Sequence, residues 1–159
     1  SPPEGALKSM RIAIGSDHAG FPLKQELATF LVEAGHQVDD LGTTNDERVD
    51  YPDFGAAVGR SVASGDNELG VCVCGTGIGI GIAANKVDGV RAAVVHDVTS
   101  ARLAKEHNDA NVVCLGARLV GPEVAQEALH AFLDTSWEAG RHAQRVDKIT
   151  ALEHDGADT

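Results

Sequence analysis

Short runs of apolar and β-branched residues alternate along the chain with longer segments in which apolar residues recur every three or four positions. The first pattern is typical of buried strands and the second of amphipathic helices. The predicted strands are residues 10–15, 37–41, 69–74, 90–95 and 111–115. The predicted helices are residues 21–34, 51–63, 78–86, 98–107, 122–133 and 139–153.

This alternation predicts an α/β fold, a three-layer Rossmann-like sandwich with a central five-stranded parallel sheet and helices on both faces. Each crossover connection is expected to be right-handed. In such sheets ligands bind beyond the carboxyl ends of the strands, near the point where the strand order reverses. The residues that directly follow each predicted strand are therefore the first candidates for chemistry.

The chain has 159 residues, a length that suits one domain, and we place that domain at residues 10–153. Residues 1–9 precede the first predicted strand, and we interpret them as a disordered extension or a remnant of expression. Residues 154–159 are predicted to form a tail. The sequence contains no apolar run of membrane-spanning length and no signal-peptide pattern at its start.

The chain is strongly acidic, with 13 basic and 24 acidic residues and a formal net charge of −11. Such a surface repels nucleic acid and anionic lipid, so we expect neither as a partner. The three cysteines do not form a disulfide framework, and free thiols indicate the cytoplasm. We find no convincing metal-ligand spacing, and we expect neither a metal nor a cofactor.

A loop with alternating glycines, residues 74–81, follows the third predicted strand. A helix that starts there would direct free N–H groups at an anion or a developing oxyanion. A dinucleotide-binding fingerprint fits formally from Gly79 to Ala84, but it starts too far beyond the strand. Lys86 lacks the preceding glycine and the following Ser or Thr of a P-loop.

Several side chains near this loop and at other element ends could carry out acid–base chemistry. Cys74 is either a buried apolar residue or a carbon base or nucleophile at the start of a helix, and its position alone leaves both interpretations open. Asp17 and His18 follow the first predicted strand, and His107 and Asn108 end the helix before the last strand. These two histidines are the better acid–base candidates.

A small basic cluster lies in the last third of the chain. Arg141 and Arg145 are four residues apart on one helix face, and Arg118 follows the last predicted strand. The cluster is either a solvated face that pairs with acidic neighbours or, if the three arginines converge, a phosphate site.

Seven short motifs in this order resemble those of the ribose-5-phosphate isomerase type B family, and they extend over nearly the whole of residues 10–153. They are Asp17-His18-Ala19-Gly20, Asp50-Tyr51-Pro52, Cys74-Gly75-Thr76-Gly77-Ile78-Gly79, Ala84-Asn85-Lys86, Glu106-His107-Asn108, Gly116-Ala117-Arg118 and Gly140-Arg141-His142 with Arg145-Val146. The family also includes isomerases of galactose 6-phosphate, allose 6-phosphate and tetrose phosphates.

The resemblance implies a metal-free isomerisation between ribose 5-phosphate and ribulose 5-phosphate through a cis-enediolate. Cys74 would be the base that moves the proton between C2 and C1, and His107 would open the furanose ring. Thr76 and the N–H groups of Gly75, Gly77, Ile78 and Gly79 would hold the enediolate oxygens.

The resemblance also implies how the substrate is bound. Asp17 and His18 would bind the sugar hydroxyls or relay protons among them, Tyr51 would lie beside the ring, and Asn108 would donate a hydrogen bond. Arg118, Arg141 and Arg145 would bind the phosphate.

The family's assembly implies a homodimer or tetramer with shared sites. We expect His107, Asn108 and Arg118 to come from the other chain, and the last helix to reach across the interface. Some relatives have a glutamate base at the position of Ile80, so this chain falls in the cysteine branch.

Two alternatives stay open. The substrate could be another sugar phosphate, a tetrose 4-phosphate or the 6-phosphate of allose or galactose. The chain could instead be a non-catalytic, flavodoxin-like module that binds a phosphorylated ligand. A phosphoacceptor receiver domain is disfavoured because Cys74 stands where its acidic residue should end the third strand.

Overall fold

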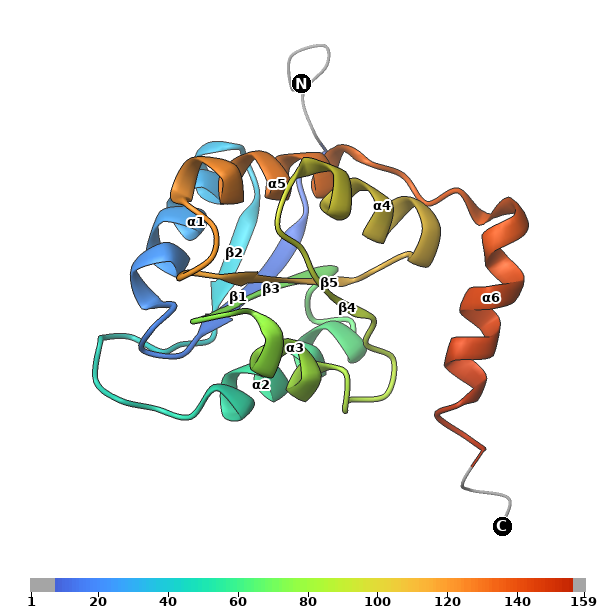
Figure 1. Ribbon diagram of the computed structural model, residues 1–159, viewed down its shortest axis with the longest axis horizontal. Helices are drawn as coiled ribbons and strands as arrows, with labels where there is room; N and C mark the ends of the chain where they lie inside the picture. Colours follow the sequence, from blue (N-terminus) through green and yellow to red (C-terminus); the bar gives the residue numbers. More distant parts are fainter. Residues whose placement is uncertain (1–7, 156–159) are drawn as a thin grey trace.

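Five parallel strands form one sheet between two layers of helices, and the last helix stands at the side of these layers (Figure 1). The computed structural model describes residues 8–155. In chain order the elements are β1 (Arg11–Ser16), α1 (Phe21–Glu33), β2 (Gln37–Asp40), α2 (Tyr51–Ala63), β3 (Leu69–Cys74), α3 (Ile78–Ala84), β4 (Ala92–Val94), α4 (Val98–Asn108), β5 (Val112–Gly116), α5 (Pro122–Asp134) and α6 (Ala139–Ala151). The predicted α/β class and its parallel sheet are confirmed.

The strand order is β2-β1-β3-β5-β4. The chain moves from β1 outward to β2 and then crosses back to β3, so the order reverses between β1 and β3. The carboxyl ends of these two neighbours, Ser16 and Cys74, therefore flank the point where ligands bind in open α/β sheets.

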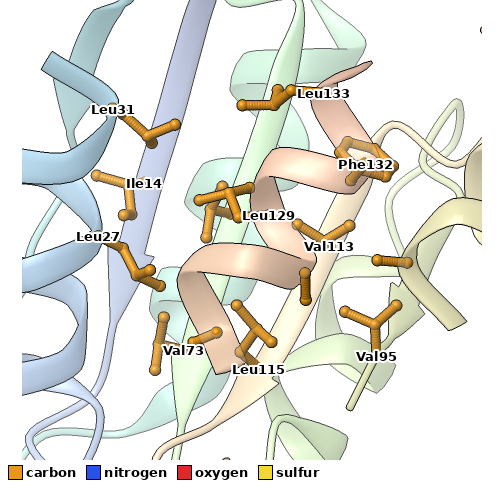
Figure 2. Close-up of a cluster of buried hydrophobic side chains, with 14 of the residues drawn as sticks. Ile14, Leu27, Leu31, Val73, Val95, Val113, Leu115, Leu129, Phe132 and Leu133 are labelled. Atoms are coloured by element: carbon orange, nitrogen blue, oxygen red, sulfur yellow. The ribbon is translucent and has the colours of Figure 1, made fainter. Parts of the chain in front are cut away.

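Each face of the sheet packs on its own apolar cluster. Helices α1, α4 and α5 cover one face, and Figure 2 shows Ile14 of β1 beside Leu27 of α1, and Val113 of β5 beside α5, which carries Leu129. Helices α2 and α3 cover the other face, where Val58 and Ile80 are fully buried. Because burying one such side chain stabilises a fold by about 1.5–3 kcal/mol, the two clusters hold the strand ends in place.

Strand β4 is shorter than the predicted segment 90–95 because it lies at the sheet edge and pairs only with β5. On its outer side the Asn85 side chain takes the place of a further strand. The amide N of Ala92 donates to Asn85 Oδ1 at 2.8 Å, and Asn85 Nδ2 donates to the Ala92 carbonyl at 2.9 Å. The exposed edge is therefore closed by a side chain.

Helix α6 passes the β4 edge of the sheet instead of joining either layer (Figure 1). At its start, the N–H of Glu138 donates to the Glu106 carbonyl at 3.1 Å. Beyond its end, Glu153 Oε1 accepts from the N–H of Gly89 at 2.8 Å. Gly140, with φ +22°, interrupts the first turn. The helix is thus fastened to α4 at one end and to the loop before β4 at the other.

The predicted extension and tail lie mostly outside the described residues. Within the described range, the Ser9 hydroxyl donates to the Gly35 carbonyl at 2.9 Å, and His154 donates its N–H to the Ala151 carbonyl at 3.0 Å. In residues 8–155, none of the helices has the length and apolar character needed to cross a bilayer.

His36, in the turn between α1 and β2, makes the stability of this fold depend on pH. The side chain is buried, and its Nδ1 accepts a hydrogen bond from the Met10 N–H at 3.1 Å. Nε2 has no partner among the described residues. Burial lowers the pKa of His36 below its ordinary value, so the unfolded chain takes up a proton at higher pH than the folded chain does.

We therefore predict that the free energy of unfolding decreases as the pH falls from about 8 to about 5.5, through the ordinary histidine pKa towards the lowered one. In a His36→Gln variant the amide oxygen can accept the same N–H bond, and the decrease should be smaller. Urea unfolding of both proteins at the two pH values measures this. An equal pH dependence in the two proteins would contradict the assignment to His36.

Candidate active site

Cys74 ends β3, and its sulfur is held at the start of the glycine loop. The thiol is almost completely buried, and Sγ accepts a hydrogen bond from the N–H of Gly77 at 3.1 Å. Gly77 has φ +78°, a left-handed conformation, and a Cβ there would lie 2.9 Å from the Leu115 carbonyl carbon. Only glycine fits this position, so the close packing of the loop on β5 is what directs the N–H at the sulfur.

The loop also presents backbone donors that nothing in the described chain uses. The N–H groups of Gly75, Thr76 and Gly79 have no acceptor within residues 8–155. The Thr76 hydroxyl, by contrast, accepts from the N–H of Ile78 at 3.2 Å and so keeps its own proton free to donate. Free N–H donors beside a candidate base are the arrangement that stabilises an oxyanion.

Arg118 lies along this same loop. Its N–H donates to the Gly75 carbonyl at 2.9 Å, and its Nε lies 3.4 Å from where a Cβ on Gly75 would be. The expectation that Arg118 comes from another chain is therefore wrong. Since β5 pairs with β3, the residue that follows β5 necessarily arrives beside the residue that follows β3.

Asp17 and His18 come directly after β1, on the other side of the point where the strand order reverses. Asp17 is buried, and its Oδ1 accepts from the N–H of Gly20 at 2.9 Å. His18 is half-buried, and its Nδ1 lies 3.2 Å from both the amide N and the carbonyl O of Val49. The imidazole is thereby joined to the loop between β2 and α2.

Tyr51 begins α2, and its ring packs directly on Gly79. A Cβ on Gly79 would lie 2.7 Å from two ring atoms of Tyr51. The third glycine of the loop therefore makes room for a tyrosine ring. It follows that Tyr51, which is 42% exposed, stands at the same edge of the sheet as Cys74.

His107 and Asn108 lie at the opposite edge. Helix α4 starts after the carboxyl end of β4 and returns to the amino end of β5, so its last residues are at the amino edge. Its 11 residues rise by about 16 Å. The rings of His107 and His142 stack with centroids 4.4 Å apart and an interplanar angle of 20°.

His142 is not among the predicted site residues, although it lies between two of them on α6. The side chain is buried, and its Nε2 has no partner among the described residues. Burial lowers the pKa of His142, and the neighbouring His107, Arg141 and Arg145 lower it further, while Glu138 raises it. Its spacing, three residues before Arg145, is the sequence signal that places it on the same helix face as that arginine.

A groove of about 840 Å³ separates α6 from β4 and α4 at this edge. His107 and Asn108 contribute to its wall, and so do Ile149 of α6 and Leu152 just after it, which are 41% and 68% exposed. Arg91 holds the end of α4 in place, because its Nε donates to the Asn108 carbonyl at 3.1 Å. A mostly apolar groove therefore lies beside His107.

Comparison with known proteins identifies the family. The sequence model of the family described as Ribose/Galactose Isomerase matches residues 12–149. The chain belongs to this family. It is 49% identical over 143 residues to ribose-5-phosphate isomerase B of Escherichia coli (strain K12), with 90% of this chain and 96% of that protein covered. The resemblance inferred from the motifs is confirmed.

Two further relatives are informative. D-erythrulose-4-phosphate isomerase of Pectobacterium atrosepticum is 42% identical over 146 residues, which cover 91% of this chain and 96% of that protein. A structure of Clostridium thermocellum ribose-5-phosphate isomerase B superposes with a TM-score of 0.90 at 51% identity, covering 91% of this chain and 97% of that one.

In this member of the ribose/galactose isomerase family, the predicted site residues together with His142 form two groups. The carboxyl-edge group consists of Asp17, His18, Tyr51, Cys74, Gly75, Thr76, Gly77, Ile78, Gly79 and Arg118. The amino-edge group consists of His107, Asn108, Arg141, His142 and Arg145. One chain does not bring the two groups together, so the three arginines do not converge within it. In residues 8–155, no cluster of three or more His, Cys, Asp or Glu side chains could hold a metal ion.

The contact between Gly79 and Tyr51 gives a testable prediction. A Gly79→Ala variant should displace the Tyr51 ring, because the added methyl group would lie 2.7 Å from it. Tyr51 is the chain's single tyrosine, so its ring signals in a proton NMR spectrum are unambiguous. Gly121→Ala is the matched control, since nothing lies within 4 Å of a Cβ there. Unchanged Tyr51 signals in Gly79→Ala would show that the packing is wrong.

Proposed function

We propose that this chain is an aldose–ketose isomerase that interconverts ribose 5-phosphate and ribulose 5-phosphate, with active sites shared between two copies of the chain. The observation that carries the proposal is the position of Cys74, whose Sγ is fixed by the Gly77 N–H beside a row of free backbone donors. A base next to an oxyanion site is what the formation of an enediolate intermediate requires.

In the reaction that we propose, Cys74 acts as the base. Its sulfur removes the proton from C2 of the open-chain aldose, and the electron pair moves to give a cis-enediolate. The N–H groups of Gly75 and Gly79 and the Thr76 hydroxyl hold the two oxygens. The proton of the C2 hydroxyl then moves to the C1 oxygen, and Cys74 returns its proton to C1, so that C2 becomes the carbonyl carbon of the ketose. Losing one such donor typically costs about 2.7–4 kcal/mol of transition-state stabilisation.

Ring opening would use the amino-edge group of the second copy. His107 exchanges the proton between the ring oxygen and the anomeric hydroxyl, and the stacked ring of His142 holds it in one orientation. Asn108 donates a hydrogen bond to the substrate. On the first copy, Asp17 and His18 bind the sugar hydroxyls, and Tyr51 lies beside the sugar.

Arginines from both copies would hold the phosphate. Arg118 lies on the glycine loop of one chain, and Arg141 and Arg145 come from α6 of the other. The net charge of −11 repels an anionic substrate, so a local cationic cluster is needed to bind it. Bidentate bonds from guanidinium groups suit a phosphate better than point charges do.

The pairing of two copies is supported by α6 and its groove. His107 lies about one helix length from the carboxyl edge of its own chain, which leaves the chemistry of one copy incomplete. The exposed Ile149 and Leu152 beside the groove supply an apolar surface that a second copy can bury. Two-fold pairing would then build two identical sites, in a homodimer or in a tetramer of two such dimers.

Other sugar phosphates are the second candidate class of substrate. The 42% identity to a D-erythrulose-4-phosphate isomerase and the family's Ribose/Galactose description favour a tetrose or hexose phosphate as the alternatives. We place the enzyme in the cytoplasm, because Cys72, Cys74 and Cys114 are free thiols. Neither nucleic acid nor a membrane is part of the proposal.

Turnover by the wild type and by Cys74→Ala tests the proposal. The wild type should isomerise ribose 5-phosphate with a higher kcat/KM than erythrose, allose or galactose phosphates. Cys74→Ala should lower kcat by about 10²–10⁴, the contribution of a general base, while sugar-phosphate binding measured by calorimetry persists. Cys114→Ala, which removes a buried thiol of the neighbouring strand β5, opposite Cys72, is the matched control.

Each outcome has a distinct meaning. Preferred turnover of a tetrose or hexose phosphate would keep the mechanism and replace the substrate. Full activity of Cys74→Ala would remove that residue as the base. If the wild type bound sugar phosphates but converted none of them, the chain would be a non-catalytic binding module.

A further inference from the structure

Lys24 of α1 is a buried cation that the mechanism above does not use. Its side chain is completely buried, and its Nζ lies 2.7 Å from both carboxylate oxygens of Asp40 at the end of β2. The ammonium group also lies 5.3 Å from the ring centroid of Phe21. A buried ammonium ion destabilises the fold unless it is paired. The contact between Lys24 and Asp40 is therefore maintained in the folded chain.

Further hydrogen bonds connect the Asp40 carboxylate to the carboxyl end of β1, directly before Asp17 and His18. Its Oδ1 also accepts from the N–H of Gly42 at 2.9 Å. The Gly42 carbonyl accepts from the N–H of Ser16 at 2.8 Å, and Thr43 donates its N–H to the Ser16 carbonyl at 2.9 Å. Both backbone groups of the residue before Asp17 are therefore held by the segment that Asp40 orients.

A second route connects Lys24 to Asp17 through α1. The Lys24 N–H donates to the Gly20 carbonyl at 2.8 Å, and the Gly20 N–H donates to Asp17 Oδ1 at 2.9 Å. The two routes leave Lys24 in different directions and meet at residues 16 and 17. Because residues 16 and 17 are consecutive in the chain, the two routes form a closed loop of contacts next to the turn that carries Asp17 and His18.

We propose that Lys24 and Asp40 are a positioning pair that sets the geometry of Asp17, His18 and the loop 41–50 for the sugar hydroxyls; this inference rests on the proposed function. The pair holds the start of the loop, and the contact of His18 with Val49 holds its far end. Tyr51 follows two residues later. A single buried charge thus acts on three side chains of the carboxyl-edge group without touching the substrate.

Lys24→Met tests this inference, because methionine fills the buried space and leaves an Asp40 side chain that is 39% exposed and can be hydrated. Arg11→Met is the matched control. It breaks the ion pair with Glu68 at the amino end of β1, the strand that ends at Ser16, where Arg11 Nη1 lies 3.5 Å from Glu68 Oε1. Asp40→Asn removes the charge from the other side and replaces Lys24→Met if that variant does not fold.

Two readouts are needed. Hydrogen exchange of the amides of Gly42, Thr43 and Val49 reports the loop directly and does not depend on turnover. We expect Lys24→Met to speed this exchange by about tenfold or more, while amides in β3 keep their protection. Steady-state kinetics on ribose 5-phosphate should show KM raised by about tenfold with a smaller change in kcat, the result of losing binding contacts. Arg11→Met should change neither.

Exchange and KM equal to the wild type, with only the melting temperature lowered, would overturn the inference and leave the pair a purely structural contact. If the wild type showed no isomerase activity, the proposed function would fail, while the exchange result would still decide whether the pair holds the loop. Faster loop exchange with an unchanged KM would overturn its link to substrate binding.

Discussion

The direction of α4 determines where the chemistry of this chain can take place. In a parallel sheet every connecting helix carries the chain back from the carboxyl edge to the amino edge. The 11 residues of α4 span about 16 Å, so His107 ends at the far edge from Cys74. Helix α6 then passes the β4 edge of the sheet and stacks His142 on His107, with Arg141 and Arg145 close enough to affect the pKa of His142. The split into two groups follows from the topology, and the proposal of a site shared between two copies rests on that split.

Within the carboxyl-edge group, close packing of the backbone positions the Cys74 sulfur and the backbone donors of the glycine loop. A Cβ on Gly116 would lie 2.5 Å from the Thr76 backbone, and one on Gly77 would contact Leu115. Because both positions lack a Cβ, the loop can lie directly on β5, with the Gly77 N–H on the Cys74 sulfur. The site's donors are held by the fold itself, and Lys24 extends this rigidity to the turn after β1.

Much of this architecture could be predicted from the sequence, because apolar periodicity reports burial and burial defines the sheet and its two layers. The residues after β1, β3 and β5 were recognisable for the same reason. Which of them meet depends on strand order, and periodicity does not encode that order. Arg118 was therefore assigned to the wrong chain, and Arg141 and Arg145 could not be placed. The stacking of His142 on His107 depends on how α6 passes the sheet edge, and the role of Gly79 depends on a ring 28 residues earlier in the chain.

Subunit mixing tests the shared site most directly. Cys74→Ala and His107→Ala proteins are each expected to be inactive, and they are combined under conditions in which subunits exchange. A mixed pair would contain one site with both residues intact, so a 1:1 mixture should regain about a quarter of the wild-type activity. If both residues acted within one chain, no mixed pair would contain an intact site. A mixture that exchanges subunits and stays inactive would contradict the account.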